Sequence, residues 1–113
     1  MKLAIIGSRG LWIDDLSEFL PDGVTEIISG GARGIDQCAE EYAKKNNLKL
    51  TVFLPDYQKY KRGAPLIRNR KIIEAADEII AFWDSKSRGT KHAIDLCKKM
   101  NKRITVYLIE DDI

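Results

Sequence analysis

Five short apolar segments recur along the chain, and helical spacing of apolar residues follows each of the first four. Strands are predicted at residues 2–7, 24–29, 49–54, 78–83 and 103–109. Strands that alternate with helices form βαβ units, in which a parallel sheet is covered by helices on both faces. Strands that are apolar along nearly their whole length are typical of this double burial. The alternation therefore predicts an α/β fold, with residues 1–113 as a single three-layer domain around a five-stranded parallel sheet.

Helices are expected over residues 12–20, over 32–46, from Pro65 to Ala76 and around Ala93 to Met100. Trp12 is predicted to lie in the core. The segment "PDYQKYKRGA" that precedes Pro65 is predicted to be a polar loop. Cys38 and Cys97 lie on helical patterns without a CxxC spacing, so we expect two buried, reduced thiols.

Charge and the amino terminus restrict the classes of partner. The chain has 19 Lys and Arg against 17 Asp and Glu, with a formal net charge of +2, which is too mild to predict nucleic-acid binding by charge alone. The opening "MKLAIIGSRG" has one lysine and a short apolar run, and therefore resembles neither a signal peptide nor a membrane span. A cytoplasmic protein with no membrane partner is expected.

The segments after the first four strands share glycine, serine and arginine. Parallel strands bring these segments to one edge of the sheet, near the point where the strand order reverses. Glycines let a ligand approach the backbone, helix N-termini offer N–H donors, and arginine binds phosphate in bidentate fashion. The pattern predicts a site for a phosphate-bearing small molecule, formed by Gly7, Ser8, Arg9, Ser29, Gly30, Gly31, Arg33, Gly34, Arg68, Asn69, Ser87, Gly89 and Thr90.

Asp56 and Asp84 are further candidates, since each follows a predicted strand and could position a ribose hydroxyl or a water. Together with Asp36 they could also hold Mg²⁺ with bound phosphates. Tyr57 and Trp83 are candidates to stack on a base, and a place in the core is the alternative for Trp83.

Arg33 is predicted in the first turn of the second helix, where backbone N–H groups already concentrate positive charge. An uncompensated arginine there costs about 0.3–1 kcal/mol. Two explanations remain open. Arg33 pairs with Asp36 one turn later, or it binds a phosphate together with Arg9 and Arg68.

The familiar phosphate and catalytic motifs are absent from the sequence. There is no G-x-x-x-x-G-K-[ST], and the first turn lacks G-x-G-x-x-G. No Ser/His/Asp set is evident by spacing. His92 is the only histidine, and a surface or structural role fits it better than general-base catalysis.

The motifs "AIIGSRG", "IISGGARGID", "VFLPDYQKYKRGAPLIRNRKIIEAADEIIAFWD" and "SRGT" occur in an order that resembles the SLOG superfamily. This Rossmann-like group includes DprA/Smf-like and LOG-like proteins, and the likeness is closest to its YspA/YpsA-related branch. The resemblance implies strand order 3-2-1-4-5 and a crevice between strands one and four. It further implies a role as a sensor of the kind found in prophage and conflict systems. The nucleotide or nucleotide-derived ligand is then expected at Ser8, Arg9, Ser29, Gly30, Gly31, Arg33, Gly34, Asp36, Arg68, Asn69 and the turn from Ser87 to Thr90.

One departure from the family bears on activity. The phosphoribohydrolase branch resembles P-G-G-x-G-T followed closely by a glutamate, whereas the turn here reads "SKSRGTKHAID". Gly89 and Thr90 remain, and Lys91 and His92 stand where the glutamate is expected. The sequence therefore favours a binding domain over a hydrolase.

Three classes of function stay open. The first is a binding or sensor domain for a nucleotide-derived ligand. The second is an enzyme that cleaves a glycosidic or phosphate bond of such a ligand. The third is DprA-like binding of single-stranded nucleic acid, to which the basic segment "KYKRGAPLIRNRK" is suited. The chain is also expected to form a homodimer.

Overall fold

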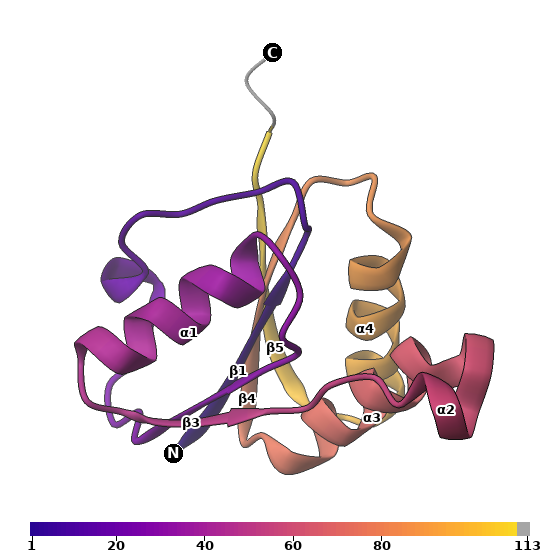
Figure 1. The fold of residues 1–113 in the computed structure, drawn as a ribbon. Helices are drawn as coiled ribbons and strands as arrows, with labels where there is room; N and C mark the ends of the chain where they lie inside the picture. The colour runs from indigo at the N-terminus through magenta and orange to yellow at the C-terminus, as the bar shows by residue number, and fades with distance from the viewer. Residues whose placement is uncertain (111–113) are drawn as a thin grey trace.

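The computed structural model describes residues 1–110 and contains one five-stranded sheet (Figure 1). The strands are β1 (Lys2–Gly7), β2 (Glu26–Ser29), β3 (Lys49–Val52), β4 (Glu78–Trp83) and β5 (Arg103–Leu108). The helices are η1 (Ser17–Phe19), α1 (Ile35–Lys45), α2 (Tyr57–Tyr60), η2 (Lys61–Gly63), α3 (Ala64–Ala75) and α4 (Arg88–Lys99). The strand order is β3-β2-β1-β4-β5, and every neighbouring pair is parallel. The predicted Rossmann-like α/β fold is confirmed.

The helices form two layers, with α1 on one face of the sheet and α3 and α4 on the other (Figure 1). Successive side chains of a strand point to opposite faces. Leu3 and Ile5 of β1 accordingly join the core under α1, whereas Ala4 and Ile6 join the core under α3 and α4. Both faces of the central strand are therefore buried, which explains why its sequence is apolar at consecutive positions.

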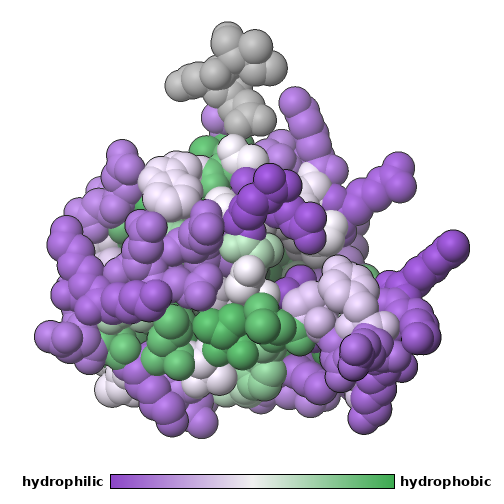
Figure 2. All heavy atoms as spheres, in the orientation of Figure 1, coloured by the Kyte–Doolittle hydropathy of each residue, from purple (hydrophilic) through white to green (hydrophobic). Residues whose placement is uncertain are grey.

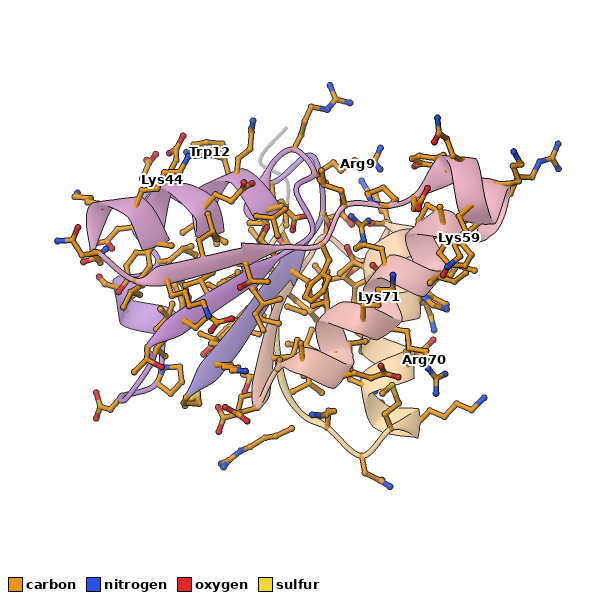
Figure 3. The ribbon with its side chains drawn as sticks, turned by 60° about the horizontal axis from the view of Figure 1, so that its bottom comes forward. Arg9, Trp12, Lys44, Lys59, Arg70 and Lys71 are labelled. Carbon is orange, nitrogen blue, oxygen red and sulfur yellow. The ribbon has the colours of Figure 1, made fainter. Side chains whose placement is uncertain are left out.

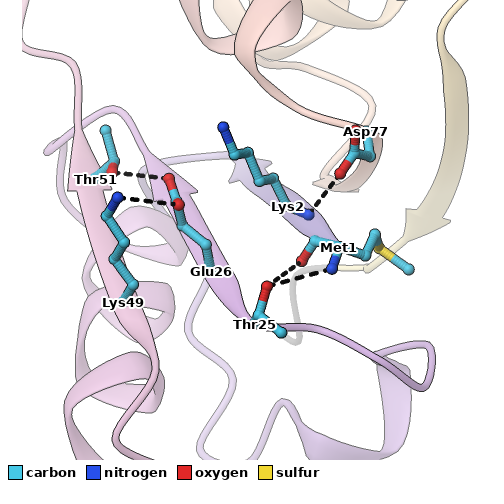
Figure 4. A network of polar contacts seen from close by, with 7 residues as sticks. All are labelled: Met1, Lys2, Thr25, Glu26, Lys49, Thr51 and Asp77. Atoms are coloured by element: carbon cyan, nitrogen blue, oxygen red, sulfur yellow. Dashed lines mark hydrogen bonds and ion pairs between the residues drawn. The ribbon is translucent and has the colours of Figure 1, made fainter.

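The amino ends of the strands are joined by polar contacts (Figure 4). The backbone N–H of Lys2 donates to Asp77 Oδ2 at 2.8 Å, and Thr51 Oγ1 donates to Glu26 Oε2 at 2.9 Å. The N-terminal ammonium of Met1 donates to Thr25 Oγ1 at 3.2 Å. These contacts join β1 to the start of β4 and β2 to β3, at the edge opposite the carboxyl ends of the strands.

The predicted helix over residues 12–20 is wrong, because this segment is largely a loop with only the single turn η1. Asp15 Oδ1 accepts hydrogen bonds from the N–H of Ser17 at 2.9 Å and from its hydroxyl at 2.6 Å. Such local side-chain bonds give the backbone an alternative to helix. Leu16 is buried, but Trp12 is 50% exposed and donates to Asp14, so its predicted core position is also wrong.

Smaller differences concern element ends. The predicted polar loop before Pro65 contains α2 and η2, because Asp56 Oδ1 accepts the N–H of Lys59 at 3.1 Å and caps a short helix. The second strand begins at Glu26 instead of 24, the third ends at Val52 instead of 54, and the fifth ends at Leu108 instead of 109. The second helix covers Ile35–Lys45 instead of 32–46, since Gly34 before it has φ +72°.

Both cysteines are buried free thiols, as predicted. Burial raises the pKa of the Cys97 thiol to about 11 and also raises that of Cys38. None of the helices in residues 1–110 is long and apolar enough to cross a membrane.

The surface is mixed in polarity, with hydrophilic residues around a hydrophobic band that follows the outer strand β3 (Figure 2). Leu50 and Val52 of β3 are half-buried there, and Leu54 beyond its end is 69% exposed.

Candidate functional site

A pocket of about 420 Å³ lies at the carboxyl ends of β1 and β4. These strands are adjacent, with Gly7 paired to Phe82. From β1 the sheet grows through β2 and β3 in one direction and through β4 and β5 in the other, so the strand order reverses between β1 and β4. Open parallel sheets bind ligands at this position. Of the predicted site residues, the pocket brings together Gly7, Arg9, Gly30, Asp36, Arg68, Asn69, Asp84, Ser87, Gly89 and Thr90.

The first segment follows β1. A Cβ at Gly7 would lie 2.6 Å from Ile35 Cγ1 and 2.7 Å from the Phe82 carbonyl oxygen, so glycine allows α1 to begin against the strand. Ser8 is buried, and its hydroxyl accepts the N–H of Asp84 at 3.2 Å. Ser8 therefore joins the segment after β1 to the segment after β4 and is not among the residues lining the pocket.

The segment after β2 leads into α1 and supplies Asp36. This residue lines the pocket although it is only 6% exposed. Its Oδ2 accepts the N–H of Ala32 at 3.1 Å. Burial raises the pKa of the Asp36 carboxyl, against the opposing effects of the Ala32 N–H, Arg68 and Arg9. The site thus keeps a carboxylate in a position where ionisation is disfavoured.

Arg68 reaches the pocket from α3. Its Nη1 donates to the Gly30 carbonyl oxygen at 2.5 Å, and its Nε donates to Asn69 Oδ1 at 3.1 Å. Burial also lowers the pKa of Arg68, although Asp36 partly offsets that effect. Within residues 1–110 these two charged groups do not approach to the 4.0 Å of an ion pair.

Gly30 lies where a side chain would crowd both charged groups. A Cβ on Gly30 would lie 2.8 Å from Arg68 Nη1 and 3.0 Å from Asp36 Oδ2. Any side chain there would have to displace the guanidinium from the Gly30 carbonyl. Glycine at this position therefore permits the observed placement of Arg68.

The fourth segment is the turn between β4 and α4. Asp84 Oδ1 accepts the N–H groups of Lys86 and Ser87, each at 2.8 Å, which lowers the pKa of Asp84 and keeps it ionised. Ser87 caps α4 by accepting the Thr90 N–H at 3.4 Å. Ser87, Gly89 and Thr90 then present the first turn of α4 to the pocket.

Arg9 completes the set of charged residues. It lies at the loop that leaves β1, as its label in Figure 3 shows, and it lines the same pocket as Arg68. Two guanidinium groups from separate segments and the first turn of a helix therefore converge on one cavity. Such groups bind oxyanions.

The other predicted residues lie outside the pocket lining. Ser29 is fully buried, and its hydroxyl donates to the Asp36 carbonyl oxygen at 3.3 Å. Gly31 and Gly34 both have φ +72°, a conformation that favours glycine. Asp56 caps α2.

Arg33 is exposed and precedes α1, which begins at Ile35, so its predicted place in the first helical turn is wrong. It makes no ion pair with Asp36 in the described residues. The pairing with Asp36 is therefore not observed, and phosphate binding by Arg33 stays a prediction.

Several lining residues carried no chemical signal in the sequence. Ile6, Ile72 and Ala93 form an apolar part of the wall, and their helical or strand periodicity indicates only burial. Gly10 also lines the pocket, and a Cβ there would meet no atom within 4 Å. Its position in "GSRG", directly after the first strand, was the only feature of the sequence that pointed to the pocket.

No group of three or more His, Cys, Asp or Glu side chains within residues 1–110 is arranged to hold a metal ion. Asp36 and Asp84 share the pocket, but Asp56 is not in its lining. The Nδ1 atom of His92 is buried without a hydrogen-bond partner among the described residues, and His92 does not line the pocket.

Comparisons of the chain with protein-family models, curated proteins and solved structures found no match. The assignment of a function therefore depends on the pocket itself.

Proposed function

We propose that the pocket binds a nucleotide or nucleotide-derived ligand through a phosphate, and that the chain acts as a binding or sensor domain. The observation that carries the proposal is the convergence of Arg9, Arg68 and the first turn of α4 in one cavity at the carboxyl edge of the sheet. Arginine is suited to phosphate because its planar guanidinium offers paired donors. The resemblance of the ordered sequence motifs to SLOG proteins supports the same ligand class.

A binding role is favoured over hydrolysis because Asp84 is bound to its own turn and the pocket lining holds no histidine. Asp84 is committed to two backbone N–H groups of its own turn. His92 does not line the pocket, so no histidine can act beside Asp36 or Asp84 there. A general acid or base must reach the reacting atom and have a matched pKa, and the pocket offers no histidine for that task.

Calorimetric titration with 5′-nucleotides of the four common bases tests this function. Arg68→Lys keeps the charge but removes the paired donors, so affinity should fall about tenfold or more. Arg70→Lys is the matched control, because Arg70 is exposed and paired with Glu74. Equal affinities of the two variants, or no binding of any nucleotide by the unaltered protein, would contradict the proposal.

Single-stranded nucleic acid is a second candidate ligand, favoured by one observation. Residues 57–71 contain six Lys and Arg and no Asp or Glu. Lys59, Arg70 and Lys71 lie around α2 and α3 (Figure 3), and Lys59 and Lys71 both lie over the ring of Tyr60. A basic surface with aromatic side chains suits a polynucleotide strand.

A further inference from the structure

The charged side chains that line the pocket are balanced. Arg9 and Arg68 contribute two positive charges, and Asp36 and Asp84 contribute two carboxylates. A site built for several phosphates would be expected to hold an excess of cations, because each phosphate monoester carries about −1.5 to −2 charges at neutral pH. The pocket has no such excess.

Hydrogen bonds hold both carboxylates in place in the pocket wall. Asp36 is 6% exposed and is held by the Ala32 N–H. Asp84 is held by the N–H groups of Lys86 and Ser87 at 2.8 Å. Both negative charges are consequently fixed parts of the wall, whereas charges on flexible surface side chains could move away at little cost.

Asp36 is also placed to accept a hydrogen bond. A carboxylate has about four lone-pair sites, of which the Ala32 N–H uses one. Arg68 Nη1 and Asp36 Oδ2 both approach Gly30, so the pocket wall presents a donor and an acceptor close together there. A hydroxyl or amino group satisfies such a pair of neighbours, whereas a phosphate oxygen satisfies only the arginine.

We infer that the pocket selects a nucleotide with a single phosphate over the corresponding di- and triphosphates, and that Asp36 is the residue that sets this selectivity. The inference rests on the proposed function. One phosphate dianion matches the two guanidinium groups, and the donor groups of the sugar or base then face Asp36. A second or third phosphate adds negative charge near Asp36 and Asp84 with no further lining cation to meet it. The volume of about 420 Å³ is near the lower end of the range of about 300–1,000 Å³ for ligand pockets.

The test is a calorimetric series with the 5′-mono-, di- and triphosphates of adenosine, guanosine, cytidine and uridine, without divalent cations. For the best base, the monophosphate should bind the unaltered protein about tenfold more tightly than the triphosphate. Asp36→Asn keeps an acceptor for the Ala32 N–H but removes the charge. The ratio of the triphosphate and monophosphate dissociation constants should therefore fall about tenfold in this variant. Asp95→Asn is the control, because Asp95 is an exposed acid of α4 that pairs with Lys91 and does not line the pocket.

The outcomes separate the inference from the function on which it rests. A triphosphate that binds most tightly, or an unchanged ratio in Asp36→Asn, overturns the selectivity while leaving nucleotide binding in place. A ratio that narrows equally in Asp95→Asn overturns the role of Asp36. Failure of every nucleotide to bind overturns both. If Asp36→Asn does not fold, the series on the unaltered protein still decides the selectivity.

Discussion

Asp36 is buried beside two arginines, yet burial outweighs their attraction. Burial is the largest influence on both Asp36 and Arg68, raising the pKa of the first and lowering that of the second. Glu40 adds a small effect that also raises the pKa of Asp36. Ionised Asp36 therefore costs folding free energy. A ligand that donates hydrogen bonds to the carboxylate would recover part of that cost.

The pH dependence of stability tests this account. The pKa of Asp36 in the folded state lies above the ordinary value of 3.8. Its ionisation consequently lowers stability as pH rises through the interval between the two values, and the cost vanishes below 3.8. Asp36→Asn should be more stable than the unaltered protein at about pH 7, with the difference shrinking toward about pH 3.5. Urea unfolding at both pH values measures it. A variant that is less stable at neutral pH would show that the carboxylate stabilises the fold through the arginines.

The candidate site was predictable at the level of residues where chain geometry determines direction. Gly7 ends β1, Arg9 and Gly30 follow strands, and Asp36 lies in the first turn of α1; a parallel sheet brings such positions together. Sequence spacing says less about which way a side chain points in an irregular turn. The exposure of Arg33 was therefore not predictable from the sequence, although its neighbour Ala32 lines the pocket.

At the scale of elements, Gly89 is the second residue of α4 and lines the pocket. A Cβ there would meet nothing within 4 Å, and its φ is not in the positive region. The free protein therefore has no steric need for glycine at this position. Gly89→Ala should stabilise it, by up to about 0.5–1 kcal/mol, while weakening nucleotide binding by filling space at the helix terminus.

Gly63→Ala is the matched control for this prediction. Gly63 also has open space around a Cβ and lies at a helix terminus, at the end of η2 before α3, but not in the pocket lining. Calorimetry should show a loss of affinity only in Gly89→Ala. Thermal unfolding should not show the same stabilisation in Gly63→Ala, because glycine is preferred over alanine at the N-cap, which Gly63 forms for α3. Equal affinities would remove the first turn of α4 from the binding site.

Asp56 offers a second prediction about an element. Its side chain caps α2 and it lies outside the pocket lining, although its position after a strand had suggested a ligand contact. Asp56→Ala should lower the free energy of unfolding by about 1 kcal/mol, as for other N-cap losses. Nucleotide affinity should be unchanged, and Asp56→Asn should retain the cap. A loss of affinity in both variants would return Asp56 to the site.

The long periodic elements were predictable and the short ones were not. The apolar patterns of the sequence were sufficient to predict the five strands and the helices α1, α3 and α4. Residues 12–20 have apolar spacing compatible with a helix, but the hydrogen bonds of Asp15 decide the local conformation. Apolar periodicity does not register such competition.

At the scale of the whole molecule, ligand binding should appear as added stability. A ligand that binds only the folded state contributes about 2.7 kcal/mol at 100 times its dissociation constant. For a domain of this size the melting temperature should rise by on the order of ten degrees. Thermal scans with saturating nucleoside monophosphate measure the shift, and Arg68→Lys should reduce it at the same concentration. An equal shift in that variant would place the binding site elsewhere in the molecule.

The distribution of charge over the chain separates the two candidate ligands. Residues 57–71 hold six of the 19 Lys and Arg and none of the 17 Asp and Glu, so the remainder of the chain is net acidic. A strand of nucleic acid would have to follow this one basic segment, whereas a mononucleotide needs only Arg9 and Arg68 in the pocket. The two modes release different numbers of counterions.

Salt dependence therefore decides between them. Binding of a single strand that neutralises five or six phosphates should weaken with a logarithmic slope of about −4, at about −0.7 per phosphate, and a mononucleotide on two arginines with a slope no steeper than about −1.5. We expect the shallow slope for nucleoside monophosphate between about 50 and 500 mM salt.

The second measurement is the fluorescence anisotropy of a fluorescein-labelled oligothymidylate, which should bind the protein only weakly at the lower salt concentration. The double variant Lys59→Ala, Lys71→Ala removes two cations that lie over Tyr60, outside the pocket lining, and should leave mononucleotide affinity unchanged. Tight, steeply salt-dependent binding of the oligonucleotide, lost in that double variant, would instead make the basic segment the functional surface.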